Sequence, residues 1–114
     1  MGNCNYTASI DGEKCEDIKS FLKEIGIAFK FPDYYGQNMD ALDECINDLD
    51  WIDCNSYTLK IIHFNQFLKH ESEQTRKYIL DFFNRVTNEW ASVPNYKGEE
   101  EYRSKANFTV EFVP

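Results

Sequence analysis

The sequence predicts an α/β fold in which a small parallel sheet is packed with helices. Three observations support this prediction. Apolar residues recur at helical spacing in three separate segments. Short segments rich in β-branched and aromatic residues alternate with those helical segments. No internal repeat or linker divides the 114 residues, so a single domain over residues 1–114 is expected.

The first part of the chain is expected to form a strand followed by a helix. Residues 6–10 have the composition of a short strand, which the turn pair Asp11-Gly12 ends. The next helix is expected to end at Gly26, because glycine commonly closes helices. The apolar face of this helix follows the i, i+3, i+4, i+7 spacing and consists of Ile18, Phe21, Leu22 and Ile25.

A second helix is expected to begin after Asn38, because asparagine is a good N-cap residue. One half of its helical wheel is apolar and contains Met39, Leu42, Cys45, Ile46 and Leu49. The other half is polar and mostly acidic, and contains Asp40, Asp43, Glu44, Asn47, Asp48 and Asp50. Like charges four residues apart, as at Asp40 and Glu44, cost about 0.2–0.5 kcal/mol in an isolated helix. The repeated acids therefore indicate a use for this face.

The second half of the chain continues the alternation of strands and helices. Residues 57–64 are expected to form a strand, and the pair Ile61-Ile62 in its middle predicts burial on both faces of the sheet. Residues 72–90 are expected to form a long helix, and residues 107–113 a final strand. The polar segment 91–105 between them is expected to be a loop.

Charge is distributed unevenly along the chain. The formal net charge is −8, and the segment 31–59 contains no Lys, Arg or His. Its seven acids are Asp33, Asp40, Asp43, Glu44, Asp48, Asp50 and Asp53. A field of one sign favours binding of a strongly basic partner, whereas nucleic acid and anionic membranes require basic faces. The sequence therefore predicts a protein partner, with no nucleic acid and no membrane.

The sequence gives no sign of export. No segment has the length of a membrane span, and the N-terminus lacks a charged region followed by an apolar one, so a cytoplasmic location is expected. The cysteines at positions 4, 15, 45 and 54 lack the spacing of zinc or redox motifs. Free thiols are favoured in the cytoplasm, although two disulfides could form in an oxidising compartment.

Catalysis is not predicted. The carboxylates lie on an open helix face, where nothing desolvates one of them for work as a general acid, so a hydrolase is the weakest class of function. Cys45 lies on the apolar side of its helix and is expected to be buried. Asp48, Asp50 and Asp53 lack the glycine and closing glutamate of an EF-hand. We therefore expect no enzyme activity, cofactor or metal.

Protein binding is the function class that the residue types favour. Tyr34, Tyr35 and Trp51 are of the kinds that anchor interfaces. One of the two tyrosines is expected to belong to the core. Gly36 is expected to let the backbone turn, which would bring the aromatic loop beside the start of the second helix.

The run FPDYYGQNMDALDECI, residues 31–46, resembles the barstar family of intracellular ribonuclease inhibitors. The ungapped matches are Pro32, Asp33, Tyr34, Tyr35, Gly36, Asn38, Asp40, Ala41, Leu42, Glu44 and Cys45. The resemblance implies a three-stranded parallel sheet packed with helices. It also implies a loop and second helix that plug a ribonuclease active site. The expected partner-binding residues are Tyr34, Tyr35, Gly36, Asn38, Asp40, Asp43, Glu44, Asn47, Asp48 and Trp51.

In this interpretation Asp40 and Glu44 meet the cationic groups with which the enzyme binds phosphate. The chain is expected to be a monomer when free and to bind one basic ribonuclease, as an immunity protein binds its toxin. The alternative is an adaptor domain that uses the same acidic face on another basic protein and inhibits no nuclease.

The sequence departs from the family pattern at several positions. Asp43 replaces a tryptophan between the two helix acids, and Glu44 replaces an aspartate. Leu49 stands where the family has a tryptophan after the helix. A contact acid of the third helix falls near Asn84 or Arg85 and is lost. These departures favour a cognate ribonuclease different from the family's best-known target, such as a toxin delivered between competing cells.

Overall fold

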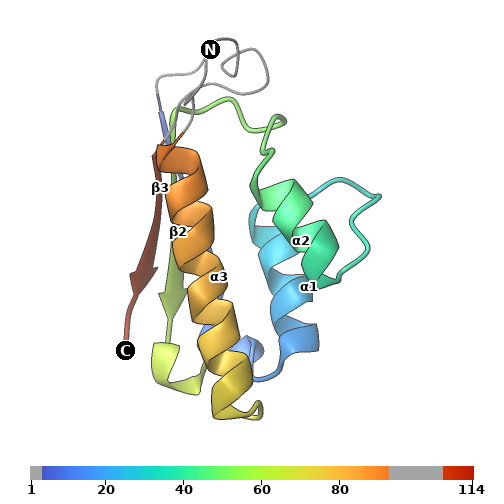
Figure 1. Ribbon diagram of the computed structural model, residues 1–114, viewed down its shortest axis with the longest axis vertical. Coiled ribbons are helices and arrows are strands. Elements are labelled where there is room, and N and C mark those ends of the chain that lie inside the picture. Colours follow the sequence, from blue (N-terminus) through green and yellow to red (C-terminus); the bar gives the residue numbers. More distant parts are fainter. Residues whose placement is uncertain (1–3, 93–106) are drawn as a thin grey trace.

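Three parallel strands form one sheet in the computed structural model, which describes residues 4–92 and 107–114 (Figure 1). The strands are β1 (Asn5–Asp11), β2 (Ser56–Ile62) and β3 (Asn107–Phe112). The helices are α1 (Ile18–Ala28), α2 (Met39–Ile46) and α3 (Glu73–Ala91), with short 3₁₀ turns at Gly12–Lys14 and Phe64–Gln66. The predicted alternation of strands and helices is confirmed. The loop expected at 91–105 falls almost entirely outside the described residues.

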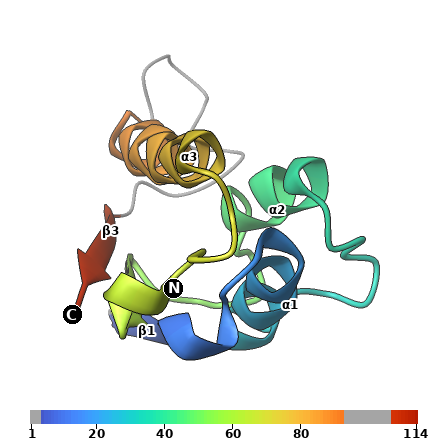
Figure 2. The ribbon, with the colours of Figure 1, turned by 90° about the horizontal axis from the view of Figure 1, so that it is seen from below.

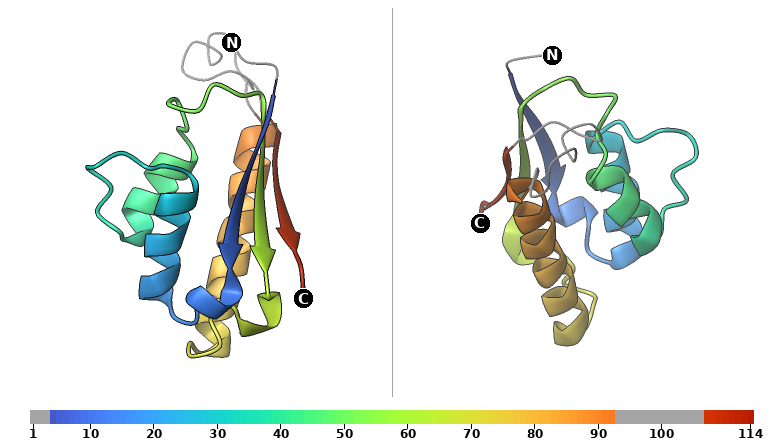
Figure 3. Two further views of the ribbon diagram at one scale, coloured as in Figure 1. Left: turned by 180° about the vertical axis from the view of Figure 1, so that it is seen from behind. Right: turned by 45° about the horizontal axis from the view of Figure 1, so that its top comes forward.

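The sheet has the order β1-β2-β3, and its helices lie on one side of it (Figures 2 and 3). Seen from behind, the strands lie in front of α3, α1 and α2 stand beside them, and no described element covers this face of the sheet (Figure 3). Thr7, Thr58 and Thr109 are in register on this open face. The predicted burial of Ile61-Ile62 on both faces is therefore wrong: Ile61 is fully buried, whereas Ile62 on the other face is partly exposed.

Aromatic and aliphatic side chains fill the space between the sheet and the helices. Phe21 packs edge-on against Phe67 and Phe83 from the other half of the chain. The buried indole of Trp90 in α3 donates a hydrogen bond to the carbonyl oxygen of Ile46 at the end of α2, at 3.1 Å. Burial of these side chains supplies the main favourable free energy of folding. It also holds α2 against the rest of the molecule.

Each long helix begins at a side-chain cap. Asp17 accepts a hydrogen bond from the Ser20 amide at 2.8 Å, and Ser72 accepts one from the Thr75 amide at 3.1 Å. These bonds satisfy amide groups that have no partner within the helix.

Helix α1 does not end at Gly26 as predicted, but continues to Ala28. The left-handed residue that follows it is Lys30, with φ of 56°. The amide of Phe31 then donates to the carbonyl of Gly26, as in a Schellman motif. Gly26 has a packing role instead, because a Cβ there would lie 2.7 Å from Cε2 of Tyr35.

A disulfide joins Cys4 to Cys54, so the prediction of free thiols is wrong for this pair. Neighbouring parallel strands explain it: Asn5 pairs with Ser56, which brings the segments before β1 and β2 together. The sequence does not show this proximity, because the two cysteines lie 50 positions apart. Cys15 and Cys45 are free and buried, as Cys45 was predicted to be. No helix within the described residues is long and apolar enough to cross a membrane.

Candidate protein-binding face

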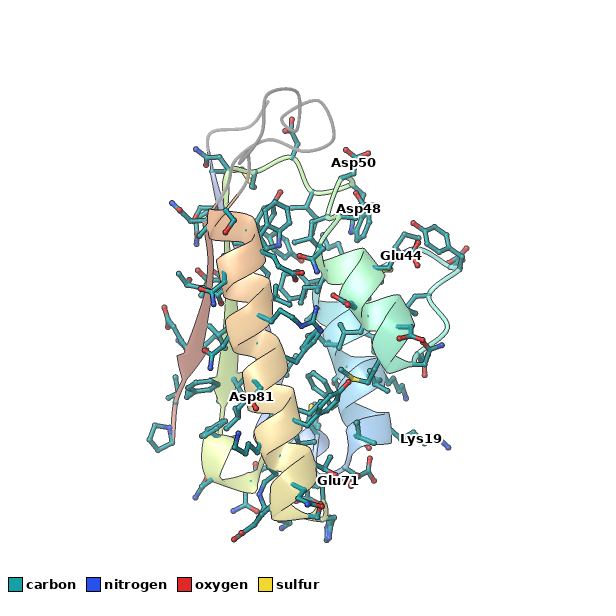
Figure 4. The ribbon with its side chains drawn as sticks, viewed as in Figure 1. Lys19, Glu44, Asp48, Asp50, Glu71 and Asp81 are labelled. Carbon is teal, nitrogen blue, oxygen red and sulfur yellow. A yellow bond between two sulfur atoms is a disulfide. The ribbon has the colours of Figure 1, made fainter. Side chains whose placement is uncertain are left out.

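Helix α2 presents an edge of acidic side chains to solvent. Asp40, Glu44 and Asp48, which we call the acidic edge, are all exposed. Asp40 and Glu44 lie one turn apart on α2, about 6 Å along its axis. The helix ends at Ile46, earlier than the predicted wheel to Asp50, so Asp48 lies just beyond the C-cap Asn47. Figure 4 shows Glu44, Asp48 and Asp50 following one another along the side of the molecule that carries α2.

The opposite side of α2 is buried and fixes the helix in place. Leu42 and Ile46 are fully buried, and Cys45 is 3% exposed. Burial raises the pKa of the Cys45 thiol, and the nearby carboxylates of Glu44 and Asp48 raise that pKa further. A thiol held protonated in this way is a poor nucleophile, so Cys45 serves packing.

Asn38 is the N-cap of α2, as predicted. Its side-chain oxygen accepts a hydrogen bond from the Ala41 amide at 2.8 Å. Asp40 lies in the first turn, where the helix dipole favours negative charge. The loop before the cap does not turn at Gly36, because the residue with left-handed backbone is Gln37, with φ of 53°. Gly36 is exposed, and its carbonyl accepts a long hydrogen bond of 3.5 Å from the side-chain amide nitrogen of Asn38.

The two tyrosines of the loop take different environments. Tyr35 packs on Gly26, its hydroxyl donates to the Leu22 carbonyl at 2.7 Å, and burial raises the pKa of that hydroxyl. Tyr34 is 70% exposed. Desolvation raises the pKa of its hydroxyl, and so do Cys45 and the carboxylates of Asp48 and Glu44. Tyr34 is therefore the exposed aromatic beside the acidic edge, and the expectation that one tyrosine belongs to the core is met.

Asp43 and Asn47 face α3 rather than solvent alone. Arg85 holds both carboxylate oxygens of Asp43 at 3.2 Å, and its guanidinium lies 5.1 Å from the centre of the Phe82 ring. The side-chain amide nitrogen of Asn47 donates to the carboxylate of Asp43 at 2.9 Å and to that of Glu89 at 3.2 Å. The sequence did not reveal that Arg85 reaches across to α2, since the two residues are 42 positions apart. Asp43 therefore adds little net charge to the face.

Trp51 is partly buried and forms part of the support beneath the loop. Its indole nitrogen donates to the Phe29 carbonyl at 2.9 Å, and its ring meets Phe31 edge-on. Part of its side chain stays exposed to solvent. Its contacts with Phe29 and Phe31 support the loop, a role that the sequence did not indicate.

Metal ligands come together elsewhere on the molecule. Among the described residues, Asp11, Glu13 and His63 offer three ligand atoms within 4.8 Å of one another. His63 Nδ1 already lies 2.9 Å from Asp11, and this contact lowers the pKa of Asp11 and raises that of His63. Within this group, Asp11 and His63 are joined by a hydrogen bond, which becomes an ion pair when His63 is protonated.

The fold and this face together define a small α/β domain, in which a row of exposed acids and an exposed aromatic loop are carried on a one-sided parallel sheet. Comparison with known proteins identifies the family. The model of the family described as Barstar (barnase inhibitor) matches residues 5–111, so the chain belongs to that family. It is also 31% identical over 83 residues to "Putative ribonuclease inhibitor YrdF" of Bacillus subtilis (strain 168). That alignment covers 71% of this chain and 89% of the relative.

Proposed function

We propose that this protein inhibits a basic ribonuclease by occupying the active site of that enzyme with the acidic edge and Tyr34. Family membership supports ribonuclease inhibition as the general activity. The observation that carries the finer proposal is the exposed acidic edge, which stands beside a 70% exposed tyrosine within a segment that has no cation of its own.

The chemistry of a ribonuclease cleft explains the fit. A cleft that binds RNA phosphates must contain cationic groups, and carboxylates on a rigid helix can form charge-assisted hydrogen bonds with those groups. The net charge of −8 attracts such an enzyme at long range. This family's best-known complex is itself the standard example of such steering.

The ten predicted residues divide into three groups within this proposal. Asp40, Glu44, Asp48 and Tyr34 are exposed and contact the enzyme. Asn38 and Gly36 shape the loop, whereas Tyr35, Asp43, Asn47 and Trp51 hold the face in position through the internal contacts described above.

The chain acts without catalysis and as a monomer that binds one enzyme molecule, as a bacterial immunity protein binds its toxin. Its proposed place is the cytoplasm. Because cytoplasmic thiols are kept reduced, that location requires the fold to persist without the Cys4–Cys54 disulfide.

The test is an inhibition titration. A ribonuclease encoded beside this chain's gene, or a barnase-like enzyme, is assayed on a fluorogenic RNA substrate while the purified chain is added. The proposal predicts that activity falls linearly and reaches zero at one molecule of chain per enzyme. Binding without loss of activity would support the adaptor alternative instead, and failure to bind either enzyme would refute the proposal.

A further inference from the structure

A groove on the other side of the aromatic loop carries charge of the opposite sign to the acidic edge. It lies between α1 and the loop that leads to α2, and its volume is about 340 Å³. Figure 1 shows this loop standing out at the side of the molecule between α1 and the start of α2. Lys23 and Lys30 line the groove, and Asp33 is its one acidic lining residue.

Both lysines are available to a partner. Lys23 and Lys30 are exposed, and no ion pair forms at either of them within the described part of the chain. Ile27, between them on α1, is 62% exposed and is one of the few large apolar side chains that the described fold leaves in solvent. The groove thus combines an uncovered apolar side chain with two unpaired cations.

The aromatic residues that line the groove are held by contacts within the chain. Tyr35 lies on Gly26, meets Phe31 edge-on at a ring-centre distance of 4.8 Å and is anchored by its hydroxyl to Leu22. The groove is therefore formed before any partner arrives, which lowers the entropic cost of filling it.

The groove and the acidic edge share the aromatic loop. Tyr35 lines the groove, whereas its neighbour Tyr34 is close enough to Glu44 and Asp48 for their charges to affect its hydroxyl. A protein that covers Tyr34 and the acidic edge therefore meets the lysines after crossing only one loop.

We infer that the groove receives an acidic element of the ribonuclease, one that carries carboxylates flanking an apolar side chain and lies on the rim of its basic cleft. Two exposed lysines complement those carboxylates, and Ile27 with the aromatic floor complements the apolar side chain. The adjoining acidic edge and the net charge of −8 disfavour RNA as the occupant. This inference rests on the proposed function and adds that the partner is recognised by charges of both signs.

Such a two-signed pattern would fix the orientation of the enzyme. An acidic edge alone attracts any strongly basic surface, whereas an adjacent cationic groove rejects enzymes whose cleft rim is basic. The groove would thus select among ribonucleases that the acidic edge alone would admit.

The test is a charge reversal in the groove, compared with an equal charge reversal at lysines outside it. Only the groove variant should bind more weakly. Lys23→Glu/Lys30→Glu and the matched control Lys14→Glu/Lys19→Glu each make the chain more acidic by the same amount. Lys14 and Lys19 are exposed lysines outside the groove, and Figure 4 labels Lys19 on α1. Binding to the ribonuclease is measured by calorimetry and stopped-flow fluorescence, after thermal melting has shown that each variant folds.

We expect the groove variant to bind at least about tenfold more weakly than the wild type, because it would place like charges together. The control should bind equally or faster, because added negative charge steers it to a basic enzyme. If the groove variant behaves as the control does, the groove holds no acidic element and the inference is overturned. If Lys23→Glu/Lys30→Glu does not fold, Lys23→Glu alone decides in the same way.

Two further outcomes would also overturn the inference. One is saturable binding of a single-stranded RNA oligonucleotide to the wild type that the lysine reversal abolishes, because it would identify a different occupant. The other is failure of the wild type to bind any ribonuclease, which would refute the proposed function together with the inference. By contrast, equal binding by the wild type and the groove variant, as described above, would overturn the inference alone and leave the proposed function standing.

Discussion

Truncating Asp40 or Glu44 to alanine is expected to weaken ribonuclease binding while changing the stability of the free protein by less than about 1 kcal/mol. Both side chains are exposed in the free chain, and neither forms an ion pair within the described residues. Removing either one relieves a like-charge pair at i, i+4, which is worth about 0.2–0.5 kcal/mol in an isolated helix. At Asp40 this gain is offset by loss of the favourable interaction with the helix dipole, about 0.3–1 kcal/mol.

The effect on binding is much larger. Truncating one partner of a desolvated, hydrogen-bonded charge pair costs about 2–5 kcal/mol. Since 1.4 kcal/mol is a factor of ten, each variant should bind about 30-fold to several thousand-fold more weakly. The effect on binding is several times larger than the effect on stability, which separates loss of contact from loss of fold.

Calorimetric titration against the ribonuclease and urea unfolding of the free chain measure the two quantities. Glu111→Ala, an exposed acid on β3 at the open face of the sheet, is the matched control and should bind as the wild type does. If Asp40→Ala and Glu44→Ala bind normally, the acidic edge is not the contact face. If they bind weakly but also lose more than about 1 kcal/mol of unfolding free energy, the reasoning from exposure is refuted.

Three further predictions concern the fold. Gly26→Ala should destabilise the chain by about 1–3 kcal/mol in urea unfolding, because the added methyl group would overlap the Tyr35 ring. This overpacking outweighs the higher helix propensity of alanine. Unchanged or increased stability would contradict the contact between Gly26 and Tyr35. Reducing the disulfide, which spans 50 residues, should lower the free energy of unfolding by about 4 kcal/mol, whereas equal melting with and without reductant would show that the bond is absent or unimportant. Folding raises the pKa of His63 above its ordinary value of 6.5. The pairing of His63 with Asp11 therefore stabilises the fold fully below pH 6.5, and this stabilisation is lost as pH rises through the folded pKa. His63→Asn should accordingly be most destabilising in mild acid. A deficit that grows toward alkaline pH would contradict this.

Features encoded locally in the sequence were predictable. The apolar stripe of α2, with Leu42 and Ile46, and the cap at Asn38 depend on residues close together in the chain. The spacing of Asp40 and Glu44 placed them together on the exposed side of that helix. The order of strands and helices followed from the same kind of periodicity.

Features that depend on distant residues were not predictable. Gly26 was taken for a helix end because nothing in the sequence shows that the Tyr35 ring will rest on it. The pairing of Arg85 with Asp43 joins two helices, and it converts an apparent extra acid into an internal contact. The open face of the sheet likewise follows from where all three helices pack rather than from the composition of β2 (Figure 3).

The central claim is that the acidic edge enters the active site of a ribonuclease, and the kinetic type of inhibition tests it most directly. The concentration of the chain that halves the rate is measured over a range of RNA concentrations, after equilibration and with the enzyme far below that concentration, so that binding is not stoichiometric. If carboxylates occupy the sites of RNA phosphates, inhibition is competitive, and the half-inhibiting concentration rises in proportion to RNA once RNA exceeds its KM. A half-inhibiting concentration that does not change with RNA would show that RNA and the chain bind together, and would contradict the account.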